Sequence, residues 1–174
     1  MSITVSLLIL RAAVGFVLAA HGAQKLFGWF DGPGFGKTRG LVQSQGFRPA
    51  WLWALLGGLG EFGGGLLLAL GFLSPLGALG IFASMLMAVI KFNWSRGFWA
   101  AKGGYEYALV LALMGLISGI VGPGNYSLDA LLGINVPQLF FWIGLVLAII
   151  VDSIGVITSN QQTGAPAQQE AHPA

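Results

Sequence analysis

Long apolar segments separated by short polar or glycine-rich stretches set the pattern of this chain. About 20 apolar residues, at a helical rise of about 1.5 Å each, cross the roughly 30 Å hydrocarbon core of a bilayer. The pattern predicts five membrane-spanning helices, over residues 3–27, 51–73, 76–92, 105–121 and 137–157. Because most connections between them are short, we expect the helices to pack as an antiparallel bundle.

The connections differ in length and polarity. Residues 28–49 form a polar, glycine-rich stretch that is predicted to be a loop, and residues 93–104 form a shorter one. Residues 127–132 are predicted to form one short helical turn at the surface. Pro137 suits the first position of the last span, where a backbone N–H is not needed. The final stretch, residues 158–174, is rich in Gln, Ala and Pro and is predicted to be disordered.

Composition identifies the class of protein. Of the 174 residues, 56% are hydrophobic and 8% are charged, whereas soluble domains have about 25% charged residues. The chain is therefore predicted to be an all-α integral membrane protein whose first partner is the lipid bilayer. Its 28 glycines favour close helix packing in lipid. The net charge of +2 comes from a few loop residues, so it indicates orientation rather than nucleic-acid binding.

The basic residues define an orientation. Nearly all of them lie in or beside the loops after the first and third spans: Lys25, Lys37, Arg39, Arg48, Lys91, Arg96 and Lys102. By the positive-inside rule this side is predicted to be cytoplasmic in a plasma (bacterial inner) membrane, with the amino terminus outside and the carboxyl tail inside. Five tryptophans gather at the same end: Trp29, Trp51, Trp53, Trp94 and Trp99. The amino terminus lacks the basic region of a cleaved signal peptide, and we expect it to be retained.

One carboxylate lies in the middle of an apolar span. Glu61 is enclosed by the sequence Gly-Gly-Leu-Gly-Glu-Phe-Gly-Gly-Gly, residues 57–65. On a helix its neighbours three and four positions away are all glycines. A charged group at mid-bilayer costs roughly 3 kcal/mol. We therefore expect Glu61 to lie in a bare groove that another helix or a ligand approaches closely.

Four polar residues are expected to gather with Glu61 near the basic end of the bundle. His21 and Lys25 are four positions apart and share one helix face. Lys91 ends the third predicted span and Glu106 begins the fourth, so both lie near the same membrane surface. Glu61 is about ten residues from that surface, or roughly 15 Å deep. The sequence therefore predicts a polar pocket with Glu61 as its floor and the other four residues at its mouth.

Two further residues are assigned to this pocket. Arg11 lies deeper in the first span and is expected to pair with Glu61 from the far side. Trp99 belongs to the tryptophan-rich interface beside the mouth. The candidate catalytic residues are His21, Lys25, Glu61 and Glu106. The candidate cofactor-binding residues are Arg11, His21, Lys91 and Trp99.

Each of these residues also has a purely structural explanation. The two lysines are near span ends, where lysine side chains reach the head groups. Glu106 complements the dipole of the helix that it begins, and His21 can be a satisfied interior histidine. The deep arginine and glutamate can form a structural ion pair. Outside the pocket, Asp129 is expected to cap a helix, and Asp152, in the fifth span, is left without a role.

Several kinds of site are not indicated. The chain has no cysteine, which removes thiol chemistry and cysteine-held iron–sulfur clusters. One histidine lies in the membrane, so a bis-histidine haem would need a second subunit. Residues 58–63 fit a dinucleotide fingerprint, but no strand precedes them, so they indicate helix packing and no flavin site is evident. His21, Glu61 and Glu106 have no metal-site spacing, and no metal is predicted.

The chain resembles the DoxX family of small membrane proteins. The matching pieces are Arg11, His21-Gly22-x-x-Lys25-Leu-Phe-Gly28, the glycine-rich Glu61 segment, Gly97-Phe-Trp99, Gly104-Tyr-Glu106-Tyr107 and Gly122-Pro-Gly-x-Tyr-Ser-Leu-Asp129. The resemblance covers about residues 5–133, and the family's typical form has four spans. It implies a DoxX-like four-helix domain over residues 1–133, an additional transmembrane helix over 134–157, and the polar tail.

The resemblance also implies a function. Its relatives include the membrane subunit of thiosulfate:quinone oxidoreductase, and other members are linked to membrane-associated oxidative-stress complexes. It carries over His21, Lys25, Glu61 and Glu106 as matches to family motif positions. The leading hypothesis is therefore a quinone-linked subunit of an oxidoreductase complex. A chain without an evident cofactor site cannot take electrons from a substrate alone, so this hypothesis requires a redox partner protein.

Two other hypotheses stay open. The bundle can be a non-catalytic anchor or scaffold for a soluble redox partner, with the basic stretch 33–48 as its docking surface. It can also be a small transporter that uses its buried charges as a path, although the sequence has no internal repeat. Whether the chain forms a homo-oligomer is also left open.

Overall fold

A computed structural model describes residues 3–164, all of whose regular elements are helices. The α-helices are α1 (Ile3–Phe27), α2 (Gly34–Ser44), α3 (Ala50–Leu70), α4 (Ser74–Met87), α5 (Glu106–Val121), α6 (Leu128–Leu132) and α7 (Gln138–Gly164). A π-helical segment, Ala88–Asn93, continues α4, and short 3-10 turns follow at Trp94–Arg96 and Ala100–Lys102.

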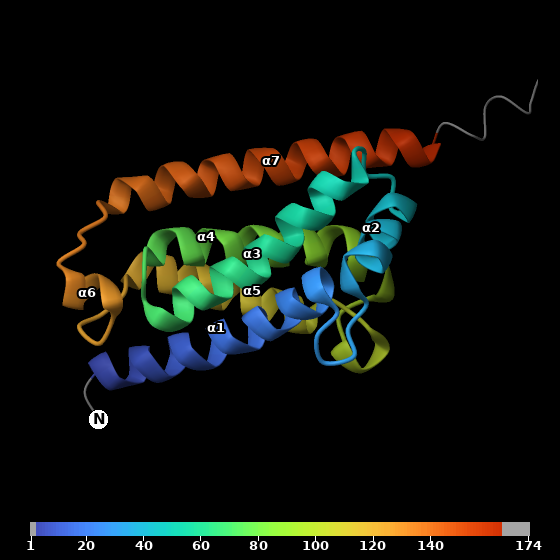
Figure 1. Ribbon diagram of the computed structural model, residues 1–174. Helices are drawn as coiled ribbons and strands as arrows, with labels where there is room; N and C mark the ends of the chain where they lie inside the picture. Colours follow the sequence, from blue (N-terminus) through green and yellow to red (C-terminus); the bar gives the residue numbers. More distant parts are fainter. Residues whose placement is uncertain (1–2, 165–174) are drawn as a thin grey trace, which may run out of the picture.

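The five long helices lie side by side and alternate in direction (Figure 1). The start of α1 and the short helix α6 lie at one end of the bundle, and α2 and the end of α7 lie at the other. Four helices are long and apolar enough to cross a membrane: α1, α3, the continuous segment Ser74–Arg96, and α7. Helix α5 matches the predicted fourth span within one residue, but its 16 residues, about 24 Å, make it shorter than these four helices. The predicted all-α antiparallel membrane bundle is confirmed.

Glycines set the spacing between the first helices. Gly15 of α1 faces Gly65 of α3, and a β-carbon added to Gly65 would lie 2.5 Å from the backbone nitrogen of Ala19. On the α4 side, a β-carbon on Gly64 would lie 3.0 Å from the carbonyl oxygen of Gly77. Helix α3 therefore uses small residues on two faces, which lets both neighbouring backbones approach closely.

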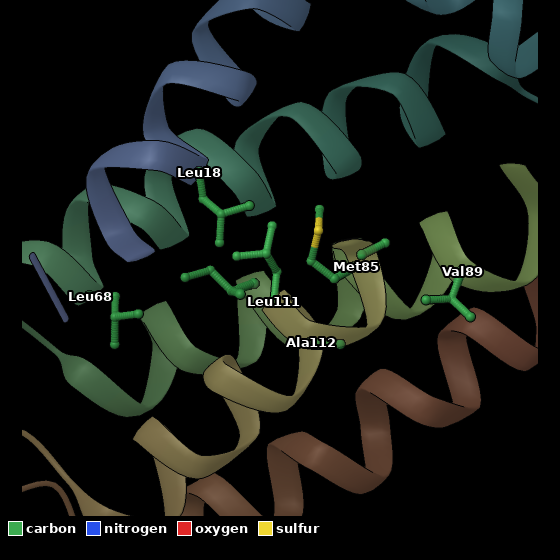
Figure 2. Close-up of a cluster of buried hydrophobic side chains, with 8 residues drawn as sticks. Leu18, Leu68, Met85, Val89, Leu111 and Ala112 are labelled. Carbon is green, nitrogen blue, oxygen red and sulfur yellow. The ribbon is translucent and has the colours of Figure 1, made fainter. Parts of the chain in front are cut away.

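A compact apolar cluster fills the space that remains between the helices. Figure 2 shows its side chains converging from α1, α3, α5 and the continuous helical segment Ser74–Arg96, called the α4 segment below. Its labelled members are Leu18, Leu68, Met85, Val89, Leu111 and Ala112. Each is at most 6% exposed, so this cluster is the packed interior of the bundle.

The prediction of a loop over residues 28–49 was wrong in part, because this stretch contains helix α2. Phe35, Thr38 and Val42 are spaced three and four residues apart and turn toward the bundle, whereas Lys37 and Arg39 are exposed. This spacing is that of an amphipathic helix. The glycines between these residues concealed it in the sequence.

Helix α7 is also longer than predicted. It continues to Gly164 rather than ending near residue 157, and Ser159 is fully buried. The extra turns pack against the segment after α2, where a β-carbon on Gly46 would collide with the Ser159 carbonyl oxygen. Residues 158–164 of the predicted disordered tail are therefore helical, because they have a surface to pack on. The rest of that tail, residues 165–174, lies outside the described residues.

Asp129 caps a helix, as predicted, but one distant in the sequence. Its Oδ1 accepts a hydrogen bond from the Leu73 backbone N–H at 2.8 Å. Its Oδ2 accepts from the backbone N–H of Ser74 at 3.0 Å and from the Ser74 hydroxyl at 2.8 Å. The carboxylate thus joins α6 to the start of α4, where the backbone donors have no helical partner.

Substituting Asp129 by asparagine is expected to lower the free energy of unfolding by about 2 kcal/mol, because the new amide group cannot accept all three bonds. Unfolding in a denaturing-detergent titration measures this change. Asp31→Asn, at an exposed position, is the matched control and is expected to have little effect. Equal losses in the two variants would contradict the capping role.

Candidate functional site

The centre of the candidate site is an ion pair between Lys25 of α1 and Glu61 of α3. Glu61 is 1% exposed, and its Oε1 accepts the hydrogen bond from the Lys25 ammonium group. The Lys25 side chain is 38% exposed, so the ion pair links a buried carboxylate to a partly exposed ammonium group. The other oxygen, Oε2, has no hydrogen-bond partner among the described residues. The two helices can cross here because Gly22 packs directly on Phe62.

Arg11 does not pair with Glu61, so that expectation was wrong. It lies fourteen residues before Lys25, about 21 Å away along α1. Its guanidinium donates to the carbonyl oxygen of Tyr126 at 2.6 Å and to that of Leu68 at 3.4 Å. Arg11 therefore connects α1 to the end of α3 and to the segment before α6, and it takes no part in the candidate site.

A small cavity of about 180 Å³ lies on one side of the ion pair. Lys25, Glu61 and His21 line it, together with Tyr107 of α5 and Asn93. The Tyr107 hydroxyl lies 3.4 Å from Nε2 of His21, and the two rings meet edge to face. The structure thus brings together three of the predicted pocket residues. Tyr107 belongs to a motif of the sequence but has no predicted role, because only the crossing of α1 and α5 brings it to His21.

The other predicted mouth residues lie at the same end of the bundle but line neither this cavity nor the larger one described next. Glu106 accepts a hydrogen bond from the Ala100 backbone N–H at 3.0 Å and so holds the preceding loop. Lys91 donates to Asn160 of α7 at 2.8 Å. Trp99 is 62% exposed. Fewer residues therefore line the candidate site than the sequence predicted.

A much larger cavity, of about 630 Å³, lies on the other side of the ion pair. It is formed by α2, α3, the α4 segment and α7, and its walls are mostly apolar side chains and glycine backbone. Representative lining residues are Val42, Trp53, Leu67, Leu76, Met87 and Phe92. Gly57 and Gly63 lie in its wall, and an added β-carbon at either would meet nothing within 4 Å. This cavity borders Glu61, but of the four glycines predicted to leave a bare groove around it only Gly57 is open, because Gly58, Gly64 and Gly65 pack against neighbouring helices.

The ion pair separates the two cavities. Lys25, Glu61, Ala88 and Asn93 line both of them. Ala88 and Asn93 are the first and last residues of the π-helical segment, a distortion that is frequent at functional sites. The Asn93 side chain also donates to the Gly103 carbonyl oxygen at 2.8 Å. The sequence carries no signal for this distortion, so the position of Asn93 was not predicted.

These features define a helical integral membrane protein with a buried ion pair between an apolar cavity and a smaller, more polar one. Residues 6–94 match the family model for DoxX, and the match covers just over half of the chain. The chain belongs to the DoxX family. The match includes the ion pair, whereas the resembling pieces after residue 94 lie outside it. No curated protein and no solved structure matches this chain.

Proposed function

We propose that this protein is a quinone-binding membrane subunit of an oxidoreductase complex. The observation that carries the proposal is the apolar cavity of about 630 Å³ with Lys25 and Glu61 in its wall. Cavities that hold small ligands measure about 300–1,000 Å³ and are mostly apolar, with a few polar groups. A quinone matches this description, because its tail needs an apolar slot and its ring oxygens need hydrogen-bond partners.

Quinone reduction also requires protons, and the residues of the smaller cavity can supply them. Reduction of a quinone by two electrons takes up two protons at the ring oxygens. His21 and Tyr107 line a cavity that reaches the same ion pair from the other side. They can exchange protons there with Glu61 or with water. The sequence has no cysteine and no evident cofactor site, so a partner protein would deliver the electrons.

Titration of the purified protein in nanodiscs with decylubiquinone tests this function. Trp53 lines the large cavity, so bound quinone is expected to quench tryptophan fluorescence in a saturable way. Glu61→Gln is expected to weaken binding about tenfold, because it alters a polar group in the wall of the large cavity. His21 lines only the smaller cavity, so His21→Ala is expected to leave the apparent Kd close to that of the unaltered protein.

Glu106→Gln is the matched control, since Glu106 touches neither cavity and its substitution is expected to leave the apparent Kd unchanged. Trp53→Phe is expected to remove much of the quenching signal. Quenching that stays linear and equal in all variants would contradict a quinone site.

A docking role for the basic end is favoured by one observation. Helix α2 presents Lys37 and Arg39 outward, and Arg48 is exposed just after it. Positively charged patches speed and orient association with acidic partners. The same excess of basic residues supports a cytoplasmic position for this end of the bundle in a bacterial plasma membrane.

Charge reversal of Lys37, Arg39 and Arg48 to glutamate tests docking separately. The triple variant is expected to lose capture of its soluble redox partner while keeping the quinone titration of the unaltered protein. Glu61→Gln is expected to give the reverse result. Association measured by co-purification at two salt concentrations checks the electrostatic origin. Capture that survives charge reversal would rule out this surface.

A further inference from the structure

Helix α7 carries one carboxylate, Asp152, which the quinone site described so far does not use. The side chain is 6% exposed, although its neighbours Val151 and Ile154 are 45% and 53% exposed. Its Oδ2 has no hydrogen-bond partner among residues 3–164. An apolar residue would bury more favourably here, so the presence of a carboxylate needs an explanation.

The other buried aspartate shows what a structural role looks like in this protein. Asp129 is 2% exposed, and its two oxygens accept three hydrogen bonds at the start of α4. Buried polar groups usually have such partners. Asp152 differs because one of its oxygens is left without a partner, and a bound ligand can supply one.

Asp152 lines the same large cavity as Glu61. Each of the two carboxyl groups has one buried oxygen without a partner. They reach the cavity from different helices, Glu61 from α3 and Asp152 from α7. The surrounding wall is mostly apolar, so the polar end of a ligand finds few other groups with which to form hydrogen bonds.

We propose that Asp152 is a second polar contact for the ring oxygens of a quinone-type ligand, which makes α7 a wall of the binding site. This inference rests on the proposed quinone function. A carboxylate accepts a hydrogen bond from a quinol hydroxyl, and a protonated carboxyl donates one to a quinone carbonyl. Asp152 therefore suits both redox forms of the ligand. It lies outside the residues that match the family model, so it adds a contact that the matched part lacks.

Decylubiquinone titration of the full chain in nanodiscs, followed by tryptophan quenching, tests the proposal. Asp152→Leu is expected to raise the apparent Kd about tenfold, since it removes one hydrogen bond in an apolar site. Ser153→Ala is the matched control on the same helix, because Ser153 is exposed and bonds only the Ile149 carbonyl oxygen of α7. Its Kd is expected to equal that of the unaltered protein.

Thermal unfolding of the same samples separates ligand binding from structure. Asp152→Leu is expected to keep or raise the melting temperature, in contrast to Asp129→Asn, which is expected to lower it. Asp152→Ala repeats the test without the bulk of leucine. An unchanged Kd in both variants overturns the inference, and so does a loss of stability like that of Asp129→Asn. If the unaltered protein shows no saturable binding, the quinone function itself fails, which is a different result.

Discussion

Replacing Gly65 by alanine is expected to destabilise the protein by about 3 kcal/mol, at the upper end of the cost of overpacking. The added β-carbon would lie 2.5 Å from the Ala19 nitrogen and 2.6 Å from the Gly15 carbonyl oxygen. Both atoms belong to the backbone of α1, so no side chain can move aside. Helices α1 and α3 must separate instead, and this loosens the crossing that holds Lys25 against Glu61.

A second glycine of the same helix gives a control with the opposite sign. Gly63 has nothing within 4 Å of its added β-carbon. Gly63→Ala is therefore expected to stabilise α3 by about 0.5–1 kcal/mol through helix propensity alone. Unfolding in a denaturing-detergent titration compares the two variants directly. If Gly65→Ala were as stable as Gly63→Ala, close packing at this crossing would not hold the bundle together.

The arrangement of the bundle could be predicted from the sequence because bilayer physics restricts the choices. Length and apolarity located the helices, and short connections made them antiparallel. Helix α2 was missed because its three inward side chains are separated by glycines and charges. The end of α7 was missed because residues 158–164 are polar, and only contact with the segment after α2 explains why they stay helical.

The candidate site was predicted in part. Spacing alone placed His21 and Lys25 on one face, and the surrounding glycines indicated that Glu61 lies in a groove. The sequence could not say which cation reaches Glu61, because that depends on where α1 crosses α3. The depth of Arg11 in the first span favoured it as the partner of Glu61. In the structure α1 crosses α3 beside Gly22, and this crossing brings Lys25 to Glu61 instead. The sequence did not indicate a role for Asp152, since its burial depends on how α7 packs against the other helices.

Replacing Lys25 by methionine is expected to lower the free energy of unfolding by about 3 kcal/mol, because it leaves a buried carboxylate without its cation. Glu61 is 1% exposed and has one oxygen without a partner already. Glu61→Leu is expected to cost much less, since Lys25 is 38% exposed and its ammonium group can reach the membrane surface. Substituting the two partners of this ion pair is thus expected to change the free energy of unfolding by unequal amounts.

The double variant Lys25→Met/Glu61→Leu separates structure from function. Exchanging a buried ion pair for apolar residues is often neutral or stabilising, so the double variant is expected to unfold like the unaltered protein. It is also expected to lose saturable quinone binding, because the ion pair between the two cavities is gone. A stable double variant that still binds quinone would make the ion pair a structural element only. A double variant as unstable as Lys25→Met would mean that the lysine stabilises the bundle by packing rather than by its charge.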